Sequence, residues 1–361
     1  MAKLTVSFTI GDSSMSQMPH QSIKPIQRVK PIKYAVFSLI AFCLVGATAL
    51  RAQTDTPEFD LTTLSTLPDN AARVYDATLD AASTQRVQHR GARHCNMKIF
   101  STASGEFISR RALRGSIDPQ ATVVLGEFHY NQNIQDAEAA LIRVLGNDSM
   151  PVAWEFLEFP DQAFQSKIFQ TYSENRLRTS VVTDLQFPLQ ADGSNATYNA
   201  VMLAVKSMRS SIVATNAPRP VKAQLMDFGY ATLDESFKPP LFNMDNASED
   251  YFERFYDALG GGAHPLPRPI EAYFESQYYT DEVIAWQAQN ARILIVGTFH
   301  SDFNDGIIPR IPVYSSRPVA NIKVLDGELL SDSEIEEFLQ GSELYGTYAD
   351  FIVIACGDSG C

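Results

Sequence analysis

Basic residues, cysteines and long apolar runs are all scarce in this sequence of 361 residues. Its 29 Lys and Arg residues stand against 42 Asp and Glu residues, which gives a formal net charge of -13. Because binding to nucleic-acid phosphates needs a basic surface, this charge excludes a general nucleic-acid binder. The four cysteines are not spaced as a metal cluster, and the chain contains neither a P-loop nor a Rossmann glycine motif.

A basic leader precedes the acidic remainder of the chain. Residues 1–49 hold five Lys or Arg residues against Asp12 alone, and residues 34–49 form an uncharged apolar run. That run is shorter than the roughly 20 residues that a membrane span needs. Together with the small residues Ala47-Thr48-Ala49, it predicts a signal peptide over residues 1–52, cleaved near Ala49 or Ala52. A retained N-terminal segment that associates with the membrane is the alternative, and translation starting at Met15 or Met18 would shorten the leader.

Cleavage of the leader removes Cys43 and leaves three cysteines. In an oxidising compartment, Cys356 and Cys361 are close enough in sequence to close a short disulfide loop, which would leave Cys95 free. The alternative is that all three remain as thiols.

The rest of the chain reads as a linker followed by one α/β domain. Residues 53–70 are polar and are interpreted as the linker; residues 71–361 form the domain, with a strand or hairpin near residues 97–108. From residue 121 onward, short apolar runs alternate with stretches of helical periodicity, which predicts a mainly parallel β-sheet flanked by helices. The apolar runs are residues 121–126, 151–157, 211–216, 292–297, 321–325 and 351–355, and the helical stretches are residues 133–145, 161–174 and 198–209.

Residues 226–291 interrupt this alternation. The segment is acidic, rich in Phe and Tyr, and divided by Gly260-Gly261-Gly262 and three nearby prolines. We interpret it as a helical insertion that forms a lid over the sheet, because it leads directly into the strand that ends at His300. The alternative is that its aromatic side chains pack the helices onto the domain.

An internal repeat marks the candidate site. Residues 123–129, VVLGEFH, resemble residues 294–300, LIVGTFH: each is a buried-type strand followed by glycine, two residues and histidine. Ligands of open α/β sheets bind at the carboxyl ends of strands. Glycine at a strand end permits close backbone approach. We therefore expect Glu127, His129 and His300 to meet at one edge of the sheet.

Two further strands end in polar groups. Glu155 lies inside an apolar run, where a carboxylate needs a partner, and Asn216 and Arg219 follow the next run. Glu155 alone could be an ion-pair partner of Arg219 or Arg292. Two imidazoles and two carboxylates, from Glu127, His129, Glu155 and His300, suit a transition metal such as Mn or Zn, or general acid–base catalysis.

Four motifs in order resemble one family. Gly126-Glu127-x-His129, Trp154-Glu155-Phe156 with Gln162, Asn216-Ala-Pro-Arg219 and Gly297-x-x-His300 are similar to the ChaN-like haem-binding uptake proteins, across roughly residues 120–315. Their superfamily includes the Tiki metalloproteases and the erythromycin esterases. The resemblance implies an α/β fold with a helical lid, bacterial export to the periplasm or cell envelope, and haem binding linked to iron acquisition. It also implies a tyrosine ligand to iron with histidine nearby, and cofacial haems at a homodimer interface.

The family pattern has two departures in this chain. Relatives usually follow the first histidine with Asp-Asn and then a histidine pair, whereas Tyr130-Asn131 and Ile134-Gln135 stand there. Tyr130 is the candidate axial ligand, since phenolate binds ferric haem. The haem-binding candidates are Tyr130, His129, His300, Asn216 and Arg219. A metal-dependent peptidase or esterase that uses the Glu/His cluster is the alternative function.

Overall fold

The computed structural model describes residues 96–146, 149–187, 194–261 and 266–357. The predicted signal peptide, the linker, and Cys43, Cys95 and Cys361 lie outside these ranges. Cys356 is disulfide-bonded to a cysteine that also lies outside them, so its pairing with Cys361 stays a prediction.

An eight-stranded sheet organises the domain, in the order β2-β1-β8-β7-β3-β6-β4-β5. The strands from β3 to β8 pair in parallel, while β1 pairs antiparallel with both β2 and β8. This confirms the predicted α/β fold with a mainly parallel sheet. The strands are β1 Asn96–Ser101, β2 Glu106–Ile108, β3 Thr122–Glu127, β4 Val152–Glu158, β5 Ile212–Asn216, β6 Ile293–Gly297, β7 Val319–Asp326 and β8 Phe351–Cys356.

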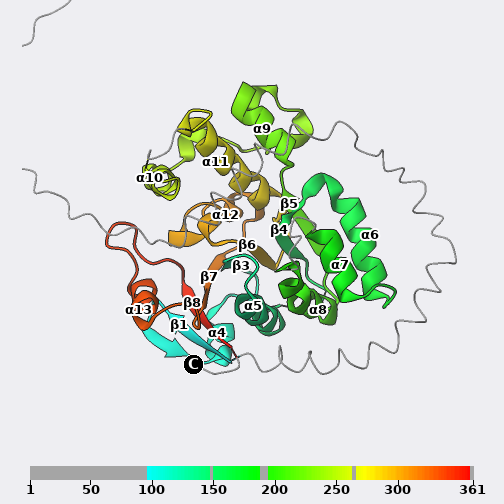
Figure 1. Cartoon of the computed structure of the whole chain (residues 1–361), viewed down its shortest axis with the longest axis vertical. Coiled ribbons are helices and arrows are strands. Elements are labelled where there is room, and N and C mark those ends of the chain that lie inside the picture. The colour runs from blue at the N-terminus through cyan, green and yellow to red at the C-terminus, as the bar shows by residue number, and fades with distance from the viewer. Residues whose placement is uncertain (1–95, 147–148, 188–193, 262–265, 358–361) are drawn as a thin grey trace, which may run out of the picture. The chain divides into compact units, whose positions relative to one another are not determined.

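Helices cover both faces of the sheet (Figure 1). One group is α5, α6, α7 and α8, and the other is α9, α10, α11 and α12. The α-helices are α4 Arg110–Ser116, α5 Gln132–Leu145, α6 Gln162–Ser173, α7 Thr179–Gln186, α8 Asn199–Ser207, α9 Arg219–Phe228, α10 Glu249–Ala258, α11 Ile270–Gln287, α12 Ile311–Ser315 and α13 Asp332–Gln340. None of these helices in the described ranges is long and apolar enough to cross a membrane.

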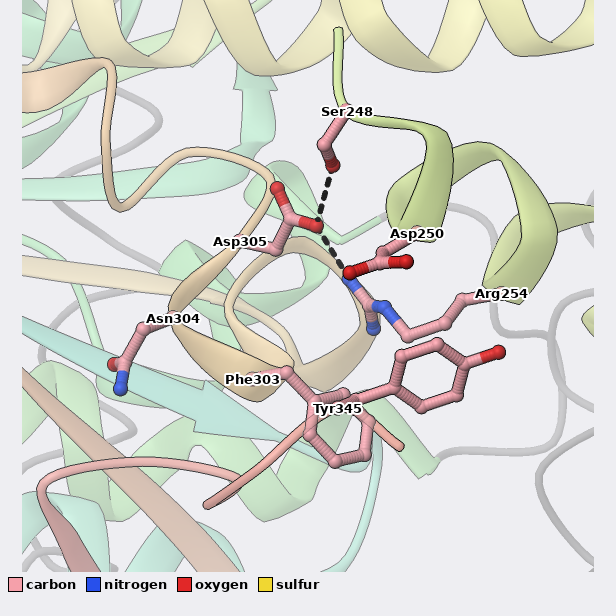
Figure 2. A pocket seen from close by; sticks show the side chains of 7 residues that line it. All are labelled: Ser248, Asp250, Arg254, Phe303, Asn304, Asp305 and Tyr345. Atoms are coloured by element: carbon pink, nitrogen blue, oxygen red, sulfur yellow. Dashed lines mark hydrogen bonds and ion pairs between the residues drawn. The ribbon is translucent and has the colours of Figure 1, made fainter. Parts of the chain in front are cut away.

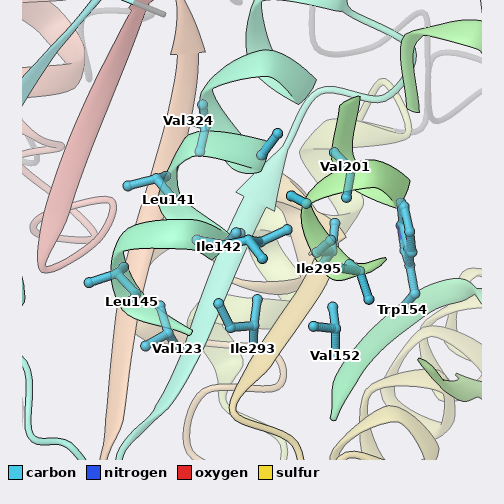
Figure 3. Packing of buried hydrophobic residues seen from close by; sticks show 14 of the residues in the cluster. Val123, Leu141, Ile142, Leu145, Val152, Trp154, Val201, Ile293, Ile295 and Val324 are labelled. Atoms are coloured by element: carbon cyan, nitrogen blue, oxygen red, sulfur yellow. The ribbon is translucent and has the colours of Figure 1, made fainter. Parts of the chain in front are cut away.

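The alternation of side chains along β3 and β6 divides the core into two layers. Val123, Ile293 and Ile295 face a large cluster with the buried sides of α5 and α8 (Figure 3). Val124 and Leu294 face the opposite way, toward α11 and α12. A central parallel strand is buried on both faces, which explains the continuous apolar runs in the sequence.

Most of α11 is a packing helix. Ile284 and Ala285 are fully buried in the cluster that covers the second face of the sheet, and Tyr251, Phe255 and Phe274 join α10 to α11. The packing alternative therefore accounts for this part of the insertion, and the lid remains a proposal for α10 and the turns before it.

Candidate functional site

The internal repeat has two arms, residues 123–129 and residues 294–300, and the glycine of each arm leaves room for side chains from neighbouring segments. Strands β3 and β6 are neighbours, with Glu127 in register with Gly297. A Cβ atom placed on Gly297 would lie 2.8 Å from Nε2 of His129 and 3.4 Å from Oε2 of Glu155. A Cβ atom on Gly126 would clash with the hydroxyl of Ser301. Each glycine therefore admits side chains that belong to other segments of the site.

Glu127 is a buried carboxylate whose two oxygens are both occupied. Oε1 accepts a hydrogen bond from the Tyr198 hydroxyl at 2.7 Å and lies 3.0 Å from Nδ1 of His129. Oε2 accepts a hydrogen bond from Nε2 of Gln135 at 2.5 Å. These partners offset the cost of burying the carboxylate. Gln135 thus helps to hold the Glu127 carboxylate in place.

Glu138 on α5 is a second buried carboxyl group, and it lies close to Glu127. Burial, then the charge of Glu127 and a hydrogen bond with it, raise the pKa of Glu138 well above its ordinary value. With Glu138 ionised, neither of its oxygens finds a hydrogen-bond donor among the described residues. The protonated form of Glu138 is therefore favoured beside the Glu127 carboxylate.

His300 lies between two carboxylates. Its Nε2 is 3.2 Å from Oε1 of Glu155, and its Nδ1 is 2.5 Å from Oδ1 of Asp281 on α11. Burial alone would lower the pKa of His300, but the charges and hydrogen bonds of these carboxylates raise it to about 10. His300 is therefore an imidazolium at neutral pH.

Glu155 is the acidic partner of His300. Its Oε2 also accepts a hydrogen bond from the backbone N–H of Gly297 at 2.5 Å. Burial would raise the pKa of Glu155, yet His300, His129 and this N–H together lower it below its ordinary value. Arg292, an alternative partner in the sequence, donates to the backbone carbonyl groups of Leu145, Asp118 and Ala121. The pairing of Glu155 with Arg292 is therefore wrong.

The two histidines differ in accessibility. The His300 side chain is 9% exposed and both its ring nitrogens contact carboxylates, whereas the His129 side chain is 21% exposed. Burial would lower the pKa of His129, but the hydrogen bond and charge of Glu127 raise it. His129 is the better placed of the two to reach a ligand.

Tyr130 extends the site with an aromatic rim. It adopts a left-handed backbone conformation with φ of 60°, and its N–H donates to the Tyr198 hydroxyl at 3.3 Å. Its half-buried ring lies 5.6 Å from that of Phe156 and 6.2 Å from that of His129. A non-glycine residue is rare at positive φ, and such conformations concentrate at functional sites.

Asn216, Arg219 and Gln162 belong to the β5 edge of the sheet. Asn216 accepts a hydrogen bond from Nζ of Lys222 at 3.1 Å, and exposed Arg219 begins α9. Gln162 accepts from the N–H of Ala214 at 2.7 Å and donates to the carbonyl of Ile212 at 3.0 Å. Gln162 therefore satisfies backbone groups of an edge strand, which is a structural role.

The sequence interpretation missed four residues that complete the cluster: Tyr198, Gln135, Glu138 and Asp281. Asp281 had a signal, because it is an acidic residue within the apolar part of α11. It also accepts a hydrogen bond from the Tyr251 hydroxyl at 2.5 Å. Tyr198 had no comparable signal, because its contact with Glu127 joins segments 71 residues apart.

The described part of the chain offers no group of three or more His, Cys, Asp or Glu side chains arranged to hold a metal ion. Both ring nitrogens of His300 already contact carboxylates, so His300 has no free nitrogen to offer a metal ion. The Mn or Zn alternative gains no support from this geometry.

Fold and site together define an α/β protein with a Glu/His cluster at the carboxyl ends of parallel strands. The chain belongs to the family of haem-binding uptake proteins of the Tiki superfamily, ChaN, whose profile matches residues 114–311. The resemblance found in the sequence is thereby confirmed.

One solved structure supports the fold, and a second match is weaker. One match is a structure described as cofacial heme binding to ChaN of Campylobacter jejuni. Its sequence is 15% identical to this chain and the TM-score is 0.53; the match covers 73% of this chain and 98% of that one. The type III effector HopBA1 is 13% identical, with a TM-score of 0.39, and the match covers 69% of this chain and 92% of that one. No curated protein matches the sequence.

Proposed function

We propose that this protein is exported to the periplasm or cell envelope and binds haem as part of haem or iron uptake. Haem would lie at the carboxyl edge of the sheet against Tyr130, His129 and Phe156, with α10 and the preceding turns as a lid. The observation that carries the proposal is the partly exposed His129, fixed at Nδ1 by Glu127 and flanked by the Tyr130 ring. A carboxylate–histidine pair is a common device for orienting histidines at metal centres.

The residues present fit haem in two respects. Tyr130 supplies a phenol and His129 an imidazole, which are both axial donors to haem iron. Tyr130 and Phe156 supply aromatic surface for the porphyrin face. Bound iron would supply the redox and ligand-exchange chemistry of haem, while the protein's own residues orient the donors. A homodimer with cofacial haems is the assembly that we propose from the family.

Haemin titration of residues 53–361 tests the proposal. We expect a Soret change that saturates at a Kd of about 1 μM or tighter. Tyr130→Phe should shift the visible spectrum of the complex, and His129→Ala should weaken binding, with the fold unchanged by circular dichroism. Tyr172→Phe is the matched control, because that phenol contacts Thr179 on α7, away from the cluster. Haemin spectra that do not change on titration would overturn the haem function.

A hydrolase is the second candidate, favoured by one observation. The pKa of Glu138, beside Glu127, is raised and that of Glu155, beside His300, is lowered, and such divergence is typical of acid–base pairs. In that case Glu155→Gln and His129→Ala would abolish turnover of ester or peptide substrates, while Tyr130→Phe would be mild. If no substrate is turned over and Tyr130→Phe has the largest effect on the haemin spectrum, haem binding is supported.

A further inference from the structure

A small pocket lies beside the candidate site, on the segment that follows His300. Its volume is about 230 Å³, and it is lined by Ser248, Asp250, Arg254, Phe303, Asn304, Asp305 and Tyr345 (Figure 2). These residues come from α10, from the loop after β6 and from the loop before β8. This volume is below the roughly 300–1,000 Å³ of pockets for drug-sized ligands, so it suits a small metabolite rather than haem.

Arg254 is the central polar group of this pocket. Its side chain is only 6% exposed, and its Nη2 has no hydrogen-bond partner among the described residues. The nearest acidic oxygen, Oδ2 of Asp305, is 3.7 Å from Nη2, which is too long for a direct hydrogen bond. A buried guanidinium N–H without an acceptor is costly. Nη2 of Arg254 is therefore ion-paired with Asp305 but has no hydrogen-bond acceptor among the described residues.

The guanidinium is held in place by its surroundings. It lies over the rings of Tyr251, Phe299 and Phe303, at 5.2, 5.4 and 5.0 Å from their centroids. Figure 2 shows its side chain extending from α10 between Asp305 and the rings of Phe303 and Tyr345. Arg254 is thus fixed before any ligand arrives, which lowers the entropic cost of binding.

The loop that forms the opposite wall is held in a rare backbone conformation. Phe303, Asn304 and Gly306 all have positive φ, at 63°, 56° and 57°. Ser248 fixes the Asp305 carboxylate through a hydrogen bond of 3.0 Å. Two adjacent non-glycine residues in the left-handed region carry a conformational cost that the surrounding structure must support. The pocket wall is therefore a built feature of the fold.

We propose that this pocket binds a small zwitterion with a carboxylate and an ammonium group, such as a free α-amino acid. The ligand carboxylate would accept from the part of the Arg254 guanidinium that lines the pocket, and its ammonium group would contact Asp250 and Asp305. A simple anion would meet the two acidic side chains, and a simple cation would meet Arg254. A ligand with both charges complements Arg254 and the exposed Asp250 together, while Asp305 keeps its hydrogen bond from Ser248. This site uses none of Tyr130, His129 and Phe156, although it shares α10 with the proposed haem lid.

Thermal-shift screening of residues 53–361 with each proteinogenic L-amino acid at about 10 mM identifies a ligand, because a ligand of the native state raises the unfolding midpoint. Calorimetry then measures its Kd against acetate and methylammonium, which carry the two charges separately. We expect at least one amino acid to bind at about 1 mM or tighter, and the two single-charge probes to bind at least tenfold more weakly. The absence of any amino-acid shift, or equal binding of acetate, overturns the proposal.

Two variants connect binding to the pocket. Asp250→Asn alters an exposed side chain at the start of α10 and should weaken amino-acid binding at least tenfold without loss of fold. Arg254→Lys keeps the charge but changes the donor geometry, and should also weaken binding tenfold or more. Both variants should retain the circular-dichroism spectrum of the unmodified protein, which shows that they are folded. Unchanged amino-acid affinity in Asp250→Asn and Arg254→Lys contradicts the assignment.

Discussion

His129 and His300 occupy equivalent places in the internal repeat, yet they have different partners because of one residue. In the first arm, the residue two positions before histidine is Glu127, and its carboxylate contacts Nδ1 of His129. In the second arm that position is Thr298, whose hydroxyl contacts Asp302. His300 therefore takes its carboxylate partners from β4 and α11. One arm is left with an accessible imidazole and the other with a buried ion-pair network.

Gly297→Ala tests the close approach of the two arms. The added Cβ would lie 2.8 Å from Nε2 and 3.1 Å from Cε1 of His129, so the imidazole must move. We expect a loss of stability of about 1–3 kcal/mol from overpacking, and haemin affinity about tenfold weaker. Gly115→Ala on α4 is the control, because nothing lies within 4 Å of its added Cβ. Urea denaturation measures the stability and haemin titration the affinity of each variant. Equal losses in Gly297→Ala and Gly115→Ala would contradict the close approach of His129 to Gly297.

The ion pairs of His300 predict a stability that falls at high pH. Its folded pKa is about 10, above the ordinary value of 6.5, so its contribution is fully present below pH 6.5. That contribution is lost as the pH rises through about 10, and its size is on the order of 5 kcal/mol. Urea denaturation between pH 7 and 10.5 measures it. His300→Gln should be less stable at pH 7 and show a flatter profile; parallel profiles for the two proteins would contradict this assignment.

At the scale of elements, the apolar runs predicted the parallel strands to within two residues. A strand that is buried on both faces leaves a continuous apolar signal, and β3, β4, β5 and β6 all carry it. Helices α7, α9, α12 and α13 were not predicted, because each is at most ten residues long. For α13 a usable signal existed: Ser331 and Glu334 form a capping box at its start.

The arrangement of the site was only partly predictable, for a physical reason. Strand ends of one parallel sheet share an edge, so the proximity of Glu127, His129, Glu155 and His300 follows from their positions in the sequence. Tyr198 and Asp281 reach the cluster from helices whose placement depends on packing across the whole core. The amino-acid pattern alone does not determine such contacts.

Asp281 couples α11 to the site. It contacts Nδ1 of His300 with one oxygen and the hydroxyl of Tyr251, on α10, with the other. In Asp281→Asn, loss of this charge should lower the pKa of His300, so its NMR titration should move from about 10 toward neutral pH. Glu282→Gln is the control, since that neighbour contacts Arg310 and Tyr314 instead. An unchanged His300 titration in Asp281→Asn would show that Glu155 alone sets its charge.

At the scale of the whole molecule, the contrast between a basic leader and an acidic domain predicts export. Residues 1–49 carry five basic residues against one acidic residue, in a chain of net charge -13. An exported location also agrees with the disulfide of Cys356, since disulfides persist in oxidising compartments.

Expression of the full chain in a bacterial host, followed by fractionation and N-terminal sequencing, tests this. We expect the cell-envelope form to begin after Ala49 or Ala52, because Ala47 and Ala49 place small side chains at the positions that a signal peptidase reads. Replacing both alanines with Phe should block cleavage and leave the leader attached, which gives a heavier product of the same domain. A mature protein that still begins at Met1, Met15 or Met18 would show that the apolar run is retained as an anchor, and would place haem binding at the membrane surface.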